Sequence, residues 1–260
     1  MKININLLLL ALILGASNFI IAQDVDKDNE LIPTFPVGLR IGAHNDFFSN
    51  TSENDILGLK FTDRVTLIGG FDVEVLRKKR WIITTGFFIK NIGHRYEYTL
   101  TPELINISRS VSRNLTQSPY WTYHLPIEAL YRINKNSKLP FFIKTGLEIQ
   151  HYGYTKGRYE NPILSVNNEV ILSNNYEEHQ SPFTFGINAG VAGDIYLKDY
   201  SKFRLALTGH YHFQKMDINR ITSTNVNGFP DATSTHRWTG NYVNLSLTYF
   251  PREGFLDFLK

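Results

Sequence analysis

Two histidines in this sequence are spaced to share a ligand. His210 and His212 flank Tyr211, and residues two apart on a strand point to the same side of a sheet. Structural zinc sites use four protein ligands and catalytic ones three, whereas this pair supplies two. The chain has no cysteine and no HExxH motif to complete a set. We therefore expect the pair to line a lumen or to stack on neighbouring rings, and we predict neither a metal site nor a cofactor.

Three further histidines stand where a hydrolytic catalyst would need them. His94, His151 and His236 lie near the ends of expected strands, with Ser, Asp and Glu nearby in the sequence. A catalytic triad is defined by the geometry of its nucleophile, base and acid. No spacing here places a base beside a nucleophile, so we predict no catalytic residues.

The elements that must position these side chains are strands. Eight segments alternate apolar and polar residues with a period of two and show no helical periodicity. In one of them Phe203, Leu205 and Leu207 alternate with Arg204 and Thr208. The expected strands are Phe35–Phe47, Arg64–Leu76, Trp81–Tyr98, Trp121–Ile133, Leu139–Tyr154, Pro182–Leu197, Lys202–Met216 and Asn241–Phe250.

The connections between these strands alternate between short and long. Short turns fall near residues 78–79, 136 and 199–200, and the long connections cover 48–63, 99–120, 155–181 and 217–240. The period of two in the residues does not decide the location, because a soluble lipocalin-like barrel or a β-sandwich would show the same period with its faces reversed. Strict alternation of short and long connections is instead typical of outer-membrane barrels. We predict an all-β, eight-stranded, up-and-down antiparallel transmembrane β-barrel with short periplasmic turns and long extracellular loops.

Aromatic residues support a membrane location. They make up 13% of the chain, with 14 tyrosines and 18 phenylalanines, and many lie near the ends of the expected strands. Amphipathic rings at strand ends suit the level of the lipid headgroups. High β-propensity alone would also enrich aromatic residues in strands, so we weigh this observation together with the connection lengths.

One hairpin, residues 121–154, has a register that can be predicted. With the turn centred on Asn136, Tyr131 would face Phe141 and Ala129 would face Ile143. The same register would pair Glu128 with Lys144 on the polar face. Pro126 cannot donate a ladder hydrogen bond, so we expect a bulge or a local gap there and favour the bulge.

The residues of this hairpin also carry a family resemblance. The segment from Tyr123 to Arg132 (YHLPIEALYR), followed by Leu139 to Gly146 (LPFFIKTG), resembles the PorT-like outer-membrane β-barrel family of Bacteroidota. The earlier hairpin, from Gly69-Gly70-Phe71 through Thr85-Gly86-Phe87 to Gly93, is similar to the same family's upstream hairpin. The resemblance covers most of residues 35–250. It implies an outer-membrane barrel that contacts an envelope or secretion complex, and the family's matching proline is the reason to favour a bulge.

The interior of an eight-stranded barrel is just wide enough to be filled by side chains. A general diffusion pore is therefore not expected. Buried charges must be paired, so we expect a structural network that neutralises the lumen, with a proton or ion pathway as the alternative. The charged residues on the inward faces are Arg40, Asp72, Glu74, Lys90, Glu128, Lys144, Glu148, Asp194 and Arg204.

The N-terminus is typical of an exported protein. Lys2 precedes the apolar run from Leu7 to Leu14, and we predict a signal peptide over 1–22; an uncleaved anchor is the alternative. A periplasmic linker is expected over 23–34, the barrel over 35–250 and a tail over 251–260, which would pack on the periplasmic rim or fray. The lack of cysteine excludes a lipoprotein anchor, and the near-neutral charge of +3 disfavours nucleic acid as a partner.

Two of the long connections contain apolar residues. Ile105, Ile107 and Leu115 belong to the second, and Ile163 and Leu164 to the third. We expect these connections to extend as hairpins that pack on one another, or to offer a surface to a partner.

We therefore expect a non-enzymatic structural or interaction module of the cell outer membrane, and the resemblance implies a PorT-like role in protein secretion. Its expected partners are outer-membrane lipids and proteins of an envelope or secretion complex, and its oligomeric state stays open. A lipid A-modifying barrel enzyme and a small-ligand binder or channel are the alternatives.

Overall fold

The computed structural model describes residues 34–53, 60–63, 65–78, 80–92, 94–100, 111–116, 120–134, 139–152, 159–166, 169–177, 183–213, 217–224 and 231–252. The expected signal peptide, nearly all of the linker and most of the C-terminal tail lie outside these residues. Within the described ranges, no helix has the length and hydropathy to cross a membrane.

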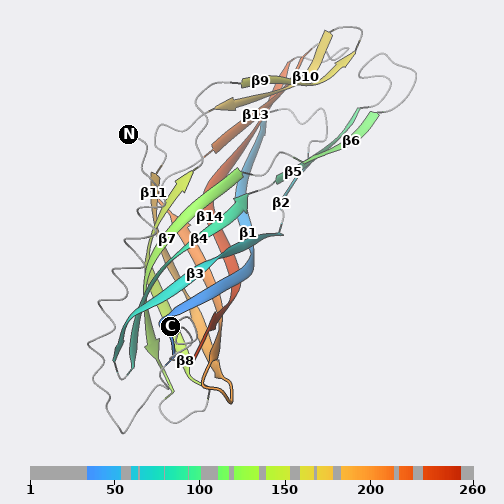
Figure 1. The fold of residues 1–260 in the computed structure, drawn as a ribbon. Coiled ribbons are helices and arrows are strands. Elements are labelled where there is room, and N and C mark those ends of the chain that lie inside the picture. Colours follow the sequence, from blue (N-terminus) through green and yellow to red (C-terminus); the bar gives the residue numbers. More distant parts are fainter. Residues whose placement is uncertain are drawn as a thin grey trace, which may run out of the picture.

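Eight strands close into an antiparallel barrel (Figure 1). Each barrel strand is hydrogen-bonded to the barrel strands that precede and follow it along the chain. The first and last strands also pair, from Leu39↔Tyr249 onward, and this pairing closes the barrel. Closure removes the exposed edges of the sheet and confirms the predicted up-and-down barrel. The strands are β1 (Val37–Glu53), β3 (Val65–Lys78), β4 (Trp81–Ile92), β7 (Tyr120–Arg132), β8 (Phe141–Tyr152), β11 (Phe183–Tyr196), β12 (Lys202–His212) and β14 (Ala232–Phe250).

The two faces of the barrel wall have the polarity of a membrane protein. Along β12, Leu205 and Leu207 are about half exposed on the outer face, at 47% and 50%, whereas Arg204 and Thr208 are buried inside at 4% and 0%. A soluble barrel would bury the leucines and expose the arginine. An apolar exterior on a closed even-stranded barrel belongs in the outer membrane, because a closed barrel leaves no backbone group unpaired in lipid.

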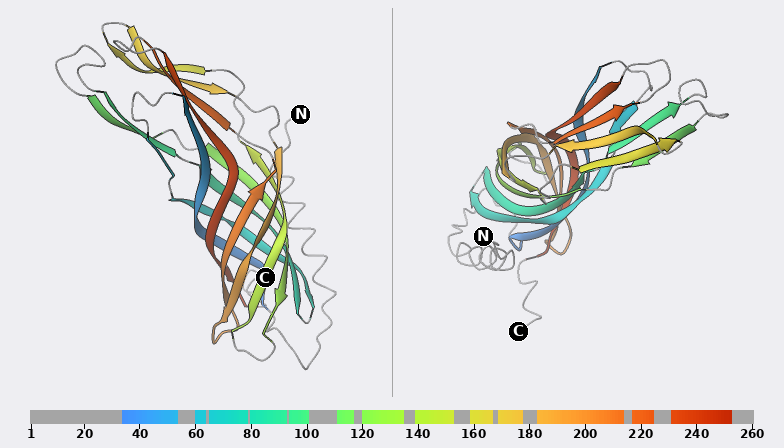
Figure 2. Two further views of the ribbon diagram at one scale, coloured as in Figure 1. Left: turned by 180° about the vertical axis from the view of Figure 1, so that it is seen from behind. Right: turned by 90° about the horizontal axis from the view of Figure 1, so that it is seen from above.

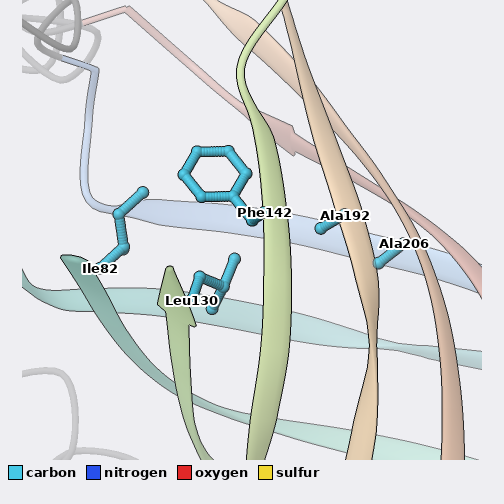
Figure 3. Packing of buried hydrophobic residues seen from close by; sticks show 5 residues of the cluster. All are labelled: Ile82, Leu130, Phe142, Ala192 and Ala206. Atoms are coloured by element: carbon cyan, nitrogen blue, oxygen red, sulfur yellow. The ribbon is translucent and has the colours of Figure 1, made fainter. Parts of the chain in front are cut away.

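The short connections and both described ends of the chain lie at one end of the barrel. Thr34 forms a β-bridge with Arg252, and the Phe35 amide donates to the Pro251 carbonyl at 2.8 Å. Just inside this end lies an apolar layer of five buried side chains (Figure 3). Both observations agree with the expectation that the ends and the short turns share the periplasmic side. The layer consists of Ile82, Leu130, Phe142, Ala192 and Ala206.

Six further strands were not predicted as separate elements, and they form sheets beyond the barrel. β2 (Lys60–Asp63), β5 (His94–Leu100) and β6 (Val111–Thr116) form a three-stranded sheet, so the expected strand Trp81–Tyr98 is divided between β4 and β5. β14 begins nine residues before its expected start at Asn241, and its early part pairs with β13 (Asp217–Ser223). β13 in turn pairs with β10 (Glu169–Glu177), and β10 with β9 (Tyr159–Val166).

The long connections therefore do extend as hairpins, but their partners differ from the expected ones. β5, whose first part belongs to the expected strand Trp81–Tyr98, pairs with β2 of the first connection and with β6 of the second. The third connection pairs with the fourth through β10 and β13. Seen along the barrel, both sheets project to the same side of the ring (Figure 2). The extracellular strands thus lean away from the barrel axis.

The register predicted for the β7–β8 hairpin is wrong by two residues. Tyr131 faces Ile143 and Ala129 faces Thr145. The cause is the side chain of Asn134, whose amide oxygen accepts from the Phe141 amide at 2.8 Å and whose amide nitrogen donates to the Leu139 carbonyl at 2.7 Å. This side chain lengthens the turn. A shift of two keeps every side chain on its predicted face.

The bulge favoured at Pro126 is also not found. The pairs Thr85↔Ile127 and Phe88↔His124 between β4 and β7 share one register, and the two intervening positions are unpaired. Pro126 therefore produces the local gap that was the other expectation, and its carbonyl accepts the Thr85 hydroxyl at 2.8 Å. Among the described barrel strands, the pairing register shifts in β1 between Asp46 and Phe48 and in β3 between Glu74 and Leu76.

Candidate functional site

The lumen is the place where chemistry-bearing side chains gather. Every charged residue predicted to point inward is buried, with at most 5% of its surface exposed. Further polar side chains are buried in the lumen. They were not among the predicted inward charges, although several have the same even or odd numbering along their strand as a predicted one. These are His44, Asp46, His124, Arg132, Lys202 and Tyr242.

At the short-turn end the charges form a compact network. Glu74 accepts from Lys202 Nζ and Arg204 Nη2, both at 2.7 Å, and pairs with Arg77. Arg204 also makes a two-pronged contact with Asp194, at 2.7 and 2.8 Å. Buried charges with this many partners hold β3, β11 and β12 together across the interior.

A second network occupies the middle of the barrel. Arg40 contacts Asp72 through Nε at 3.0 Å and Nη2 at 2.7 Å. Lys144 Nζ lies 3.0 Å from Glu128, so the predicted pairing of these charges exists despite the shifted register. Arg40 Nη2 lies 3.7 Å from the same Glu128 and links the two pairs.

Toward the long-connection end, five side chains from four strands form a cluster that we call the histidine centre: His124, Glu148, His210, His212 and Tyr242. The Glu148 carboxylate accepts from His124 Nδ1 and His210 Nδ1, both at 2.5 Å, and from the Tyr242 hydroxyl at 2.9 Å. His212 Nε2 lies 3.4 Å from the same carboxylate. The predicted common orientation of His210 and His212 is confirmed, and the fold adds a third imidazole and an acid.

The second ring nitrogen of each histidine has its own partner. Thr122 Oγ1 lies 2.8 Å from His124 Nε2, Asn244 Nδ2 lies 3.0 Å from His210 Nε2, and Thr184 Oγ1 lies 3.3 Å from His212 Nδ1. Such contacts fix ring orientation. His212 Nε2, 3.4 Å from Glu148, is buried and makes an ion-pair contact without a hydrogen bond.

A neighbouring group ties the histidine centre to β1 and β4. Lys90 pairs with Asp46, and its Nζ lies 3.5 Å from the centroid of the Tyr242 ring. His44 Nε2 lies 3.1 Å from the Asp46 carboxylate. A continuous chain of polar contacts therefore runs from His44 through Tyr242 to Glu148.

The lumen is filled from wall to wall. Phe88 stacks on His124 at a ring distance of 4.6 Å, and it reaches His210 at 6.5 Å. β4 and β12, which carry Phe88 and His210, are separated by three strands in either direction around the ring. His124 and Tyr242, which lie on the equally opposed β7 and β14, have ring centroids 5.6 Å apart. Side chains from opposite walls are therefore in contact.

The arrangement is one of hydrogen bonds and not of open metal coordination. In the described part of the chain, no three His, Asp or Glu side chains are placed to hold a metal ion. The Glu148 carboxylate itself lies where the imidazole nitrogens converge. Chemically, the centre can tie strands together and take up protons.

The three rim histidines considered for catalysis are not brought together with an acid and a nucleophile in the described structure. The side chains of His94 and His236 lie outside the described residues. His151 faces outward, with its ring 6.0 Å from that of Tyr123 and 4.8 Å from that of Phe183. It belongs to a row of aromatic side chains in contact, which continues through Tyr123 to Phe87 and Phe71. Such a row suits the level of the lipid headgroups.

No family model and no curated protein matches the chain. Among solved structures, the outer membrane protein OprG from Pseudomonas aeruginosa is similar over 85% of this chain and 98% of its own, at 10% identity and a TM-score of 0.47. A major outer membrane protein from Thermus thermophilus covers 83% and 99%, at 11% identity and a TM-score of 0.41. The outer membrane protein AlkL covers 88% and 97%, at 11% identity and a TM-score of 0.35. Likenesses at these levels say nothing about activity.

Proposed function

We propose that this protein is a non-enzymatic interaction module of the outer membrane, in which the barrel is a filled anchor and the extracellular strands make contact with a partner. The observation that carries the proposal is the contact between opposite walls of the lumen, from Phe88 to His210 and from His124 to Tyr242. An interior occupied by aromatic side chains and ion pairs does not fit a general diffusion pore.

The extracellular sheets supply the contact surface of this proposal. The larger sheet ends at β9 and the smaller one at β2 and β6, and a terminal strand presents backbone N–H and C=O groups along its free edge. A partner that contributes an extended strand can pair with such an edge. The resemblance of residues 123–146 to PorT-like barrels favours an envelope or secretion-complex protein as that partner.

The burial of the histidine centre supports a role without catalysis. Glu148 and Tyr242 are exposed by 1% and 0%, and neither faces the lipid. A lipid-modifying enzyme needs its base within reach of the lipid headgroup. We therefore expect the mass of lipid A to be unchanged when the gene is deleted.

Site-specific cross-linking tests the proposed contact. A photo-reactive residue at Ser165, which is exposed in β9, should yield a discrete cross-linked envelope protein in cells. The matched control is Asp199, exposed in the turn between β11 and β12 at the opposite end of the barrel, and it should not capture the same protein. The absence of any product from Ser165, together with stable pore conductance of the purified barrel at neutral pH, would contradict the proposal.

A further inference from the structure

The histidine centre holds more proton-accepting groups than it can neutralise. One carboxylate, Glu148, faces three imidazoles and the Tyr242 hydroxyl. A single imidazolium would be compensated by that carboxylate. A second or third proton would add positive charge without a free acid beside it, and an unpaired buried charge is costly.

The groups around the centre do not supply the missing negative charge. Lys90 on β4 interacts with His124, and Lys144 on β8 and Glu128 on β7 both interact with His210. His44 on β1 adds a further imidazole, with its ring 5.9 Å from that of Tyr242. The acids on the adjoining strands are already paired, Asp46 with Lys90, Asp72 with Arg40 and Glu128 with Lys144. β11 contributes the neutral side chains Thr184 and Asn188 to this level of the lumen.

The centre also lies at the base of the larger extracellular sheet, which the outer parts of β1 and β14 form with β13, β10 and β9 and which we call the extracellular sheet. Tyr242 belongs to β14 and Asp46 to β1, and both strands continue from this level out of the barrel, to Ala232 and Glu53. Their pairing register shifts between Asp46 and Phe48, directly beyond the inward Asp46. Contacts from Tyr242 to Glu148 and His124 tie this base to the opposite wall.

We propose that the histidine centre is an acid-sensitive switch that sets the position of the extracellular sheet relative to the barrel. Histidine changes its charge between pH 5 and 8. In the closed centre burial disfavours the charged form of each ring, so as the pH falls through this range protons favour an open arrangement in which more than one imidazole reaches water and is charged, and in which Tyr242 is separated from Glu148. Rings and acid move into water, and β1 and β14 lose their tie to β7, β8 and β12. The sheet beyond them then changes position.

Distance measurement between spin labels tests the switch directly. The chain has no cysteine, so labels can be attached at introduced cysteines alone. Ser165→Cys on β9 and Phe213→Cys at the upper end of β12, both exposed, report on the sheet relative to the barrel. We expect their distance distribution to shift or broaden between pH 7.5 and pH 5. The control pair Lys78→Cys and Asp199→Cys, in two short turns, should not change.

Histidine variants separate the switch from a general effect of acid. In the background His124→Gln, His210→Gln and His212→Gln, the Ser165–Phe213 distribution should be the same at both pH values, because no imidazole then faces Glu148. His151→Gln removes a histidine from the outer face and should leave the response intact. A wild-type protein without a shift, or a shift that persists in full in the triple variant, would overturn the proposal.

A single substitution guards against a triple variant that fails to fold. His210→Gln keeps an amide group that can donate to Glu148, so it should fold, as shown by heat-dependent migration on gels, and should move the midpoint of the transition to a different pH. An unchanged midpoint would also overturn the switch. The proposal is independent of the partner: an acid-insensitive sheet would leave the cross-linking result at Ser165 untouched, and a failure of cross-linking would leave the pH response untouched.

Discussion

Glu148 is the residue through which strands far apart in the chain are joined. It accepts hydrogen bonds from His124 on β7, His210 on β12 and Tyr242 on β14. We expect Glu148→Gln to lower the free energy of unfolding by about 1 to 3 kcal/mol, because buried donors lose a charged acceptor. Urea unfolding in lipid vesicles measures the effect. The exposed Asp231→Asn should stay within about 0.5 kcal/mol of wild type, and equal effects of the two would contradict this role.

Two adjacent glycines make a matched test of how closely the wall is packed. A Cβ atom at Gly70 would overlap the carbonyl oxygen of Phe87 and the Cα of Phe88, whereas a Cβ at Gly69 would meet nothing within 4 Å. Gly70→Ala should therefore cost about 1 to 3 kcal/mol or more, and Gly69→Ala should be close to neutral. The same unfolding assay compares them. A neutral Gly70→Ala would show that β3 and β4 are less closely packed than described.

At this scale the sequence predicts orientation but not partners. Alternation alone placed Arg40, Glu74 and Glu148 inside, and the spacing of His210 and His212 correctly predicted a shared orientation. That Glu148 would collect His124 and Tyr242 was not predictable, since their meeting depends on the stagger of strands around the ring. Residue pairs across a lumen are a property of the closed barrel.

The turn between β11 and β12 shows how a single element is held by local chemistry. Tyr200 has a φ of 66°, and the Asp199 carboxylate accepts from the Ser201 hydroxyl at 2.7 Å and the Ser201 amide at 3.1 Å. These hydrogen bonds hold the pKa of Asp199 below its usual value. The stabilisation is therefore present above the unfolded pKa of about 3.9 and is lost as the pH falls through the lower folded value.

The Ser201 amide shift in NMR reports on this titration. We expect it to move with an inflection below about pH 3.9, and Asp199→Asn should abolish the inflection while leaving the barrel folded. An inflection at or above the unfolded value would contradict the hydrogen-bonding account.

Among the elements, the sequence predicts the barrel strands well and the extracellular ones poorly. The period of two is strong where one face meets lipid and the other the lumen, as in β11 and β12. The short strands β2, β6 and β9 pair only with other loop strands, so no such contrast marks them. The predicted register of the β7–β8 hairpin was wrong because the Asn134 side chain bonds across the turn. The predicted bulge at Pro126 was wrong because the β4–β7 pairing is interrupted there without a change of register.

The whole molecule is organised by the contrast between its two solvents. Apolar side chains cover the outside and ion pairs fill the inside, so an outward and an inward charge have opposite consequences.

Leu207, half exposed on β12, faces lipid. Leu207→Arg should destabilise the barrel by about 2 to 4 kcal/mol near the membrane midplane. Leu197→Arg in the short turn, which lies outside the wall, should have little effect, and vesicle unfolding distinguishes them. Equal, small costs would argue against a lipid-facing β12.

The molecule's central property, a closed barrel in the outer membrane, can be tested by cell fractionation followed by electrophoresis with and without heating. A closed transmembrane barrel keeps its compact form in detergent until it is heated. We predict a band in the outer-membrane fraction whose migration changes on heating. A protein found in the soluble periplasmic fraction, with the same migration before and after heating, would contradict the assignment of the apolar face to lipid.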